Sequence, residues 1–530
     1  MKLRFSLLDD PLIRVRTLPD GQQTTLSLPE LLVAMAHDGI RDFPALRPHQ
    51  RHPWHAFLVQ VAALALHQAD QAGPFTDVAS WRSGLIALTP DHPDGAAWCL
   101  VTPPDRPALL QAPVPGGALG GWKNQLQTPD QLDMLITSKN HDLKAARMTR
   151  HAPEDWLLAL VSLQTQEGFL GAGNYGISRM NGGFASRPAL GAMPPGGWGR
   201  RWWRDVQRLL SSRETVVREM GLRAEGGMGL VWMQPWSGND SLSFAALDPF
   251  YVEICRRIRL VAPQDEIFAL ATGSKAARIE AKSRNGITGD PWMPIDQGAG
   301  KALTISAKGF DYRLTAELLF GKKYLAPLAQ TLQPSDGTEG IIILAQSVTR
   351  GQGKTEGYHE RRIPISPRMR RSLLERKTDA LAKLAEERVD AIAKVRGVLW
   401  TALGTLFDSG ADKDKFSDGA KDKANLFAKP FEQFEDARFF DGPLGLNAEV
   451  EADQPDEIRL RWYLDMVDRA EALLLDAFNA GPRSGERRYR AQAAALSRFH
   501  GALHSPKTLP TLAAHYQAQK EAKENPHDHP

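Results

Sequence analysis

The chain has 530 residues, more than one compact hydrophobic core accommodates, so two or more domains are expected. Its 42% hydrophobic and 24% charged residues are typical of a soluble globular protein, and no apolar run approaches the roughly 20 residues of a membrane span. The net charge of +3 is only mildly basic, and two distant cysteines, Cys99 and Cys255, exclude a disulfide framework and a cysteine-rich zinc site.

The first third of the chain alternates short strands and helices. Residues 6–16 predict a strand or strand pair, and Asp20-Gly21 predicts a turn. Ser27 followed by Pro29 indicates the start of a helix, and residues 54–67 predict a second, apolar helix. The N-terminus reaches acidic residues before a signal-peptide core could form, which, with so few cysteines, predicts a cytoplasmic protein.

Residues 84–120 are rich in proline and glycine and predict short strands at best. Residues 123–151 carry many lysine, arginine and histidine side chains and few bulky apolar residues after Ile136, which predicts a long basic loop. A short buried helix is expected at 155–164.

A glycine cluster follows this helix. Residues 168–183 contain six glycines in sixteen positions, which indicates backbone at unusual angles or in close contact with a partner. Gly171, Gly173 and Gly176 have the spacing of a dinucleotide-binding fingerprint, but the preceding element is predicted to be a helix instead of a strand. We therefore do not expect dinucleotide binding here.

The segment 341–355 is the most informative part of the sequence. Ile341 to Leu344 predict a buried strand that leads into a basic turn, Arg350 to Thr355. Gly353-Lys354-Thr355 resembles the end of a phosphate-binding P-loop, but Val348 stands where that motif requires its first glycine. Two glycines flank Gln352, a geometry that suits insertion into a nucleic-acid groove with Arg350 and Lys354 on phosphates. An ordinary turn at a strand end is the alternative.

The character of the sequence changes at Pro367. Helical periods cover residues 368–403, about 428–440, 456–480 and 486–504. A polar lysine/aspartate linker is expected at 408–424, and the tail after Glu521 is expected to be disordered. The sequence therefore predicts an α+β protein with a large mixed domain (residues 1–366) and an all-α four-helix bundle with a polar tail (residues 367–530).

No catalytic pattern was found. His500 and His504 have a metal-ligand spacing, but Gly501 replaces the glutamate of a zinc-protease motif and no third ligand is evident. A nucleophile elbow, an acidic metal cluster and a nuclease-like pattern are also missing from the sequence. We therefore expect neither enzyme activity nor a cofactor or metal.

Several of these motifs together resemble the CasA family, the large subunit of the type I-E CRISPR surveillance complex Cascade. Residues 7–15 and 27–31 are similar to the family's opening, and the 168–183 cluster is similar to its glycine loop. The 350–362 turn resembles its wedge, and the C-terminal helices match its four-helix bundle in place and size. The resemblance covers nearly the whole chain, although each motif is short.

The resemblance implies a non-catalytic DNA-recognition subunit. In such complexes guide RNA reads the target by base pairing, while protein reads a short protospacer-adjacent motif, the PAM. The family reads the PAM from the minor groove with a glycine loop, a lysine and a glutamine wedge, starts duplex opening, and supports recruitment of a helicase–nuclease.

Carried over by position, the resemblance assigns three groups of residues. The PAM and DNA contacts are Gly171, Ala172, Gly173, Asn174, Lys301, Arg350, Gly351, Gln352, Gly353 and Lys354. A loop against the crRNA-bearing end of the complex contributes Lys139, Asn140, His141, Lys144 and Arg147. The displaced DNA strand is expected at Arg483, Arg487, Arg488 and Arg490.

The implied partners are the backbone, small and crRNA 5′-end subunits of Cascade, guide RNA, double-stranded target DNA and the helicase–nuclease, with no membrane. Two alternatives remain open at this stage. One is a nucleotide-dependent enzyme that uses Gly351–Thr355, and the other is a scaffold for a different RNA–protein particle.

Overall fold

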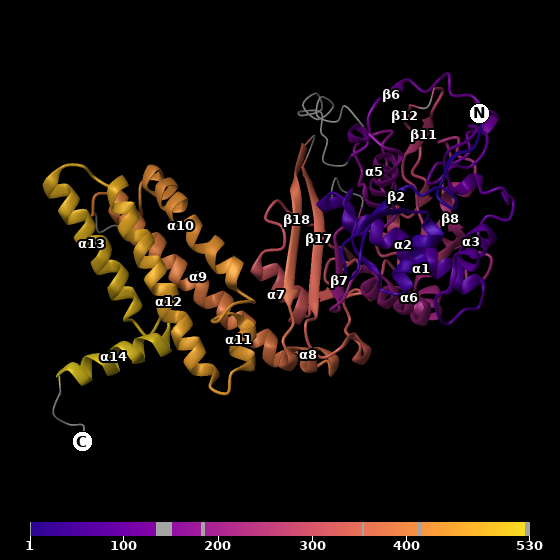
Figure 1. Cartoon of the computed structure of the whole chain (residues 1–530). Helices are drawn as coiled ribbons and strands as arrows, with labels where there is room; N and C mark the ends of the chain where they lie inside the picture. Colours follow the sequence, from indigo (N-terminus) through magenta and orange to yellow (C-terminus); the bar gives the residue numbers. More distant parts are fainter. Residues whose placement is uncertain are drawn as a thin grey trace. The chain divides into compact units, whose positions relative to one another are not determined.

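The computed structural model describes residues 2–133, 151–181, 186–264, 266–351, 354–410 and 415–524. The chain divides into two compact units, and Figure 1 shows mixed strands and helices in one and helices in the other. The mixed unit comprises Met1–Phe310 and Lys323–Arg362, and the helical unit comprises Asp311–Lys322 and Ile363–Pro530. The predicted α+β class, a mixed region followed by a helical bundle, is confirmed.

The opening of the mixed unit follows the sequence prediction. Strands β1 (Arg4–Ser6) and β2 (Ile13–Thr17) occupy the expected segment, and β2 lies between β3 (Gln23–Leu26) and β4 (Ile40–Asp42). Helix α1 (Leu28–Ala36) begins after Ser27, whose backbone N–H and hydroxyl both donate to the Glu30 carboxylate at 2.7 and 2.8 Å. These bonds satisfy groups that a helix start otherwise leaves unpaired.

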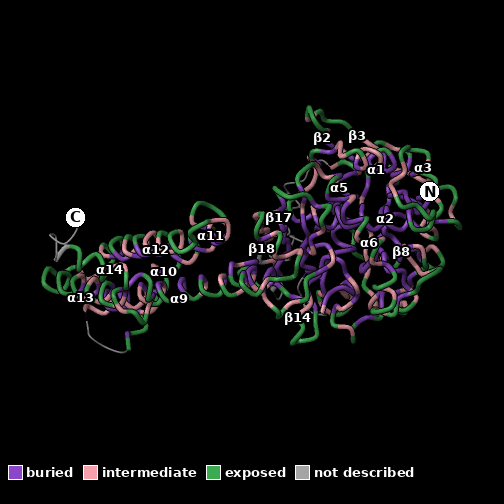
Figure 2. The backbone as a smooth tube through the Cα atoms, turned by 90° about the horizontal axis from the view of Figure 1, so that it is seen from below, coloured by how far each residue is buried: buried purple, intermediate pink, exposed green. Residues whose placement is uncertain are grey.

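Helix α2 (Arg51–Gln68) forms the centre of the core, and every residue from His52 to Leu66 is buried. A helix with apolar residues on all faces is expected to be enclosed by other elements. Figure 2 shows α2 within the buried interior of the mixed unit. The elements packed on it are α3 (Val78–Ala87), α5 (Pro153–Gln166), α6 (Trp198–Met220) and β10 (Leu247–Val252).

Small sheets surround this core. β1 pairs with β5 (Cys99–Val101), and β8 (Met228–Leu230) pairs with β10. A three-stranded sheet has the order β11 (Arg257–Val261), β12 (Phe268–Thr272), β6 (Asn124–Leu126). The remaining short pairs join β9 (Leu242–Ser243) to β13 (Ile279–Glu280), and β14 (Ile295–Asp296) to both β15 (Lys301–Ala302) and β16 (Tyr324–Leu325).

A further three-stranded sheet has the order β18 (Lys354–Pro364), β17 (Ile342–Gly351), β7 (Ala189–Met193). β17 and β7 are antiparallel, with Ile342 opposite Met193 and Gln346 opposite Ala189. The sequence predicted the first part of β17 but not β18, whose charged residues 356–362 carry no apolar run. Pairing with β17 makes this charged segment a strand.

In the helical unit, α9 (Asp379–Phe407) packs against α10 (Asp418–Arg438), α12 (Pro455–Ala477) and α13 (Gly485–Leu503). These four helices form the predicted bundle. The unit also contains α8 (Pro367–Leu374), α11 (Leu446–Glu451) and α14 (Pro510–Glu524). Helix α7 (Tyr312–Phe320), which the sequence analysis placed in the N-terminal domain, packs on α9, and the Tyr312 N–H donates to Asp436 at 2.6 Å.

Three details of the helical region differ from the sequence expectation. The linker assigned to 408–424 is too long, because α10 begins at Asp418 and buries Ala420, Ala424 and Ala428 on one face. The lysines and aspartates of α10 lie on its other faces. The polar composition of the segment therefore hid the helical spacing of its buried alanines from the sequence analysis. The 368–403 segment is divided between α8 and α9, with Arg376 at φ 57° between them, and α14 continues past the predicted start of the tail.

Among the described helices, none combines the length and the hydropathy needed to cross a bilayer. Both cysteines are buried and unpaired with each other. Burial raises the pKa of Cys99 to about 11 and of Cys255 to about 12, so both thiols are held in their neutral form.

Candidate nucleic-acid interface

The glycine loop, residues 168–176, closes on itself directly after α5. The Ile177 N–H donates to the Glu167 carbonyl at 2.9 Å and so joins the two ends of the loop. Inside it, Leu170 N–H donates to Asn174 O and Asn174 N–H donates to Gly171 O, each at 2.9 Å. The predicted residues Gly171 to Asn174 therefore form the tip of a compact turn.

Two glycines of this tip have backbone angles that other residues rarely adopt. Gly171 has φ 120° and Gly173 has φ 86°. Space is not the limit at Gly171, since a Cβ there would meet no atom within 4 Å. At Gly176 the limit is space, because a Cβ would lie 2.5 Å from the Gly168 carbonyl carbon. The glycines are thus needed for the loop's own shape, and the tip stays uncovered by side chains.

A second segment, residues 273–277 between β12 and β13, supports the loop. Ser274 N–H donates to Gly173 O at 3.0 Å, and the Tyr175 hydroxyl donates to the Lys275 carbonyl at 3.0 Å. A cavity of about 420 Å³ lies between this segment and the loop, and Lys275 and Lys282 are among its lining residues. Lys275 is exposed, and the sequence analysis did not select it. Its only sequence signal was a lysine in the turn Gly273-Ser274-Lys275.

Arg256 joins the two ends of the glycine loop. Its guanidinium donates to the Gly168 carbonyl at 2.9 Å and also to the Tyr175 carbonyl. These two carbonyls lie at opposite ends of the loop, so one buried cation closes its base. A charged donor makes such bonds stronger than neutral ones.

The β17–β18 hairpin contains the segment to which the sequence analysis assigned a wedge. β17 ends at Gly351 and β18 begins at Lys354, while Gln352 and Gly353 lie outside the described residues. The two strands are also linked by side chains, since Thr349 Oγ1 lies 3.0 Å from His359 Nε2. Gly351 and Lys354–Thr355 thus belong to paired strands, whereas a P-loop requires a helix after its glycine turn. This geometry argues against the nucleotide-dependent alternative.

A buried ion pair connects the glycine loop to this hairpin. Arg350, the penultimate residue of β17, places its NH2 atom 2.9 Å from the Glu167 carboxylate, at the root of the glycine loop. The two side chains are only 7% and 1% exposed. Burial raises the pKa of Glu167, and the nearby Arg350 and Arg256 oppose that rise.

This pair corrects one expectation from the sequence. Arg350 was assigned to a DNA phosphate, but the structure places its guanidinium in a buried contact with protein. Arg350 therefore positions the hairpin against the loop. Glu167 is a residue that sequence reasoning missed, because a lone glutamate at a helix end has no distinctive pattern.

Lys301, the other predicted lysine, is also connected to the glycine-rich region. It is exposed at the start of β15, and its neighbour Ala302 packs in a small cluster with Ile177 and Met180. The Asn181 amide donates to the Ala302 carbonyl at 3.0 Å. The described contacts thus bring the glycine loop, residues 273–277, the 295–302 hairpin and the root of β17 into one region.

In the helical unit, the predicted arginines Arg483, Arg487, Arg488 and Arg490 are all exposed. They lie just before and within the first turns of α13, together with Tyr489, which is 77% exposed. An exposed aromatic ring among arginines is a feature that the sequence analysis did not single out. The predicted assembly-loop residues Lys139, Asn140, His141, Lys144 and Arg147 lie outside the described residues.

Comparison with known proteins adds information on the fold. No family model matches the sequence, and no curated protein matches it significantly. Among solved structures, CasA (Cse1) from Thermus thermophilus is similar, with TM-score 0.64 and 16% identity over 95% of this chain and 99% of that one.

Two further structures agree. Cse1 from Acidimicrobium ferrooxidans has TM-score 0.65 and 14% identity over 95% of this chain and 98% of that one. Thermobifida fusca Cse1 has TM-score 0.64 and 14% identity, with 96% and 98% covered. The chain thus has the CasA fold over nearly its whole length, and the resemblance inferred from short motifs is confirmed at the level of the fold.

Proposed function

We propose that this chain is a CasA-type large subunit of an RNA-guided DNA-surveillance complex, and that it recognises the PAM without catalysing a reaction. The observation that carries the proposal is the Glu167–Arg350 ion pair. It holds the root of a glycine-tipped loop against the root of a strand hairpin, within a chain that has the CasA fold over 95% of its length. Two slender elements fixed side by side are suited to enter one groove of DNA.

Minor-groove recognition is consistent with the chemistry of the loop. The tip from Gly171 to Asn174 offers backbone groups with few side-chain atoms, so it can approach the floor of a groove closely. The minor groove presents a degenerate pattern of acceptors, so tolerance of several PAM sequences is expected. Gln352, between the two strands, is the proposed wedge that separates the first base pair.

Two lysines compete for the role of the minor-groove cation. The proposal favours Lys275 over Lys301, because the Lys275 segment donates a hydrogen bond to Gly173 at the tip of the loop and accepts one from Tyr175 next to the tip. Lys301 is connected to the segment after the loop through Ala302. The cavity between loop and lysine segment supports the same choice, because Lys275 lines it.

The exposed start of α13 is the proposed contact for the displaced strand. Arg487, Arg488 and Arg490 supply cations for phosphates, and Tyr489 supplies a face on which a base can stack. We also assign the remaining roles of the large subunit to this chain. These are binding to the other Cascade subunits and guide RNA, contact of the 139–147 loop with the crRNA-bearing end, and support of the helicase–nuclease in a cytoplasmic complex.

The test is PAM-duplex binding by the reconstituted complex. Gln352→Ala should weaken binding and strand opening at least tenfold while assembly is unchanged, and Gln23→Ala, an exposed strand glutamine, is the matched control. Lys275→Ala should weaken PAM binding more than Lys301→Ala. Unchanged binding and opening in Gln352→Ala, or co-purification of an unrelated RNA in place of repeat-derived guide, would reject the proposal. The second outcome would favour a scaffold of another particle.

A further inference from the structure

A basic cavity lies in the mixed unit, between the β2–β4 sheet, the start of α6 and the base of the β17–β18 hairpin. Its volume is about 540 Å³, within the range of small-molecule sites. Five arginines and two carboxylates, Asp42 and Glu360, line it. The arginines are Arg16, Arg41, Arg51, Arg201 and Arg362.

Arg201 is the unusual member of this set. Arg201 is 9% exposed, and it makes no hydrogen bond or ion pair with any of the described residues. Its Nε is fully buried without an acceptor. Burial lowers the pKa of Arg201; the nearby charges of Asp205 and Glu360 oppose this effect, and that of Arg204 adds to it. A buried guanidinium that no described residue hydrogen-bonds is unfavourable even with carboxylates nearby, so its retention at a cavity wall points to an anion from outside the chain.

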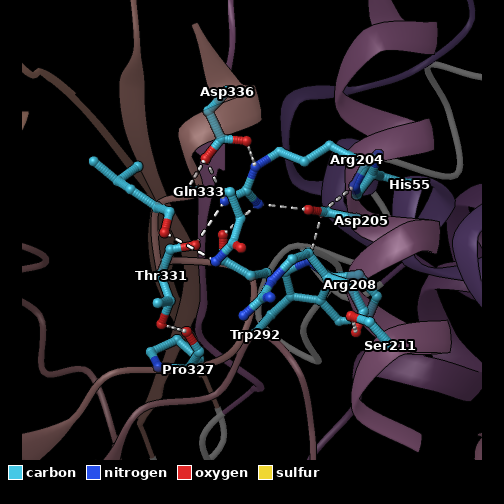
Figure 3. A network of polar contacts seen from close by, with 12 residues as sticks. His55, Arg204, Asp205, Arg208, Ser211, Trp292, Pro327, Thr331, Gln333 and Asp336 are labelled. Atoms are coloured by element: carbon cyan, nitrogen blue, oxygen red, sulfur yellow. Dashed lines mark hydrogen bonds and ion pairs between the residues drawn. The ribbon is translucent and has the colours of Figure 1, made fainter. Parts of the chain in front are cut away.

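Its neighbour on α6 shows what a satisfied buried arginine looks like. Figure 3 shows Arg204 held by Asp336, Asp205 and the Thr331 carbonyl, with the Asp336 contact at 2.6 Å. Asp205 in turn accepts hydrogen bonds from His55 and Trp292. Within the described part of the chain, Arg204 therefore has a full set of hydrogen-bond acceptors, and Arg201, three residues earlier, has none.

Three of the other four arginines are held only loosely. Arg16 and Arg41 approach Asp42 at 3.4 and 3.8 Å, and Arg51 approaches Glu360 at 3.7 Å. Only Arg362 is close to its carboxylate, at 3.0 Å. Half-exposed side chains at these distances can turn toward an incoming anion at little cost.

Two further features describe the ligand. The start of α6 is already capped by Asp38, which accepts from Gly197 N–H at 2.9 Å and Arg200 N–H at 2.8 Å, so the guanidiniums must hold the anion. Trp198 and Phe43, with ring centroids 4.8 Å apart, provide an aromatic wall. Guanidiniums suit a phosphate, and aromatic rings beside them suit a base or sugar.

We propose that this cavity binds the phosphate of a nucleotide, either free or within an RNA strand, with Arg201 as its buried anchor. The cavity does not include the glycine loop or the wedge, so the proposal is independent of PAM recognition. A nucleotide bound here would also contact the base of the hairpin at Glu360 and Arg362.

The experiment uses the purified full-length chain without its complex. Inorganic phosphate, a nucleoside monophosphate and a short single-stranded RNA are titrated separately by calorimetry and by thermal shift, against wild type, Arg201→Gln and Arg218→Gln. Arg218 is exposed near the other end of α6, so its variant matches the charge change away from the cavity. We expect at least tenfold weaker binding for Arg201→Gln only, with a ligand-free Tm that does not fall.

The outcomes separate cleanly. If the nucleoside monophosphate binds and the RNA does not, a free nucleotide is the source of the phosphate. If the RNA binds more tightly than the monophosphate, an RNA strand is the source. Absence of binding by all three probes overturns the proposal, as does equal weakening by Arg201→Gln and Arg218→Gln. A lower ligand-free Tm for Arg201→Gln would overturn it too, since it would mean that the protein itself satisfies this charge.

Discussion

The Glu167–Arg350 pair allows a prediction with a worked magnitude. Glu167→Ala removes the carboxylate that faces the Arg350 guanidinium, which is only 7% exposed. Loss of one member of a buried pair costs about 3–5 kcal/mol. Arg82 and Asp9 make a contact of the same length, 2.9 Å, with side chains 46% and 53% exposed. Asp9→Ala should therefore cost under about 1 kcal/mol and is the matched control.

The two single changes should differ in their pH dependence. In Arg350→Met, Glu167 loses the stronger of the two cations that oppose the rise of its pKa and keeps Arg256, so its pKa, already raised by burial, rises further. A carboxyl whose folded pKa exceeds its unfolded value contributes stability at low pH that is lost as pH rises through the folded pKa. Arg350→Met should therefore regain stability on acidification from pH 7 toward pH 5, relative to wild type.

The double variant Glu167→Gln with Arg350→Met supplies the decisive comparison. Replacement of a whole buried pair by neutral groups is often nearly neutral, so we expect stability close to wild type. Loop and hairpin would no longer be fixed by charge, so PAM-duplex binding by the complex should still fall. This separates a positioning role from a purely structural one.

Denaturant unfolding followed by tryptophan fluorescence is a suitable assay. Of the thirteen tryptophans, only Trp400 and Trp462 lie in the helical unit, so the signal reports chiefly on the mixed unit. A cost below about 1 kcal/mol for Glu167→Ala would show that the pair is not buried as described. Wild-type DNA affinity in the stable double variant would show that it does not position the site.

Three further predictions follow from other regions. Gly173→Val should abolish PAM-duplex binding in a gel-shift assay, because a β-branched residue at φ 86° is strained by about 1–3 kcal/mol, and binding at wild-type strength would contradict this. The pKa of His55 is lowered to about 4 by burial, so it contributes stability that is present above pH 6.5 and lost as pH falls. Thermal melts at pH 7 and 5 should show about 2 kcal/mol more loss in wild type than in His55→Gln. Replacing Arg487, Arg488 and Arg490 with alanine should reduce open-complex stability and its salt dependence with PAM preference unchanged, whereas an altered preference would refute the division of labour.

The sequence by itself determined the elements whose signals are local. The start of α1 is encoded by Ser27 and Glu30, which hydrogen-bond within one turn, and by Pro29, which has no N–H that would need a partner there. The stripes of α9 and α12 repeat at helical spacing, and the glycines of the loop are needed wherever φ is positive. These signals need no knowledge of the rest of the chain, so they could be read directly.

Tertiary structure alone decided the contacts between distant residues. Glu167 and Arg350 are 183 positions apart, and their pairing depends on β7 lying beside β17. The proposed preference for Lys275 over Lys301 rests on which segment supports the glycine loop, and among the described residues Arg204 has hydrogen-bond acceptors on distant segments that Arg201 lacks. Local sequence specifies the chemistry of a side chain. Its burial and its partners come from long-range packing, and these decide whether a charge is paired within the fold or is available to bind a ligand.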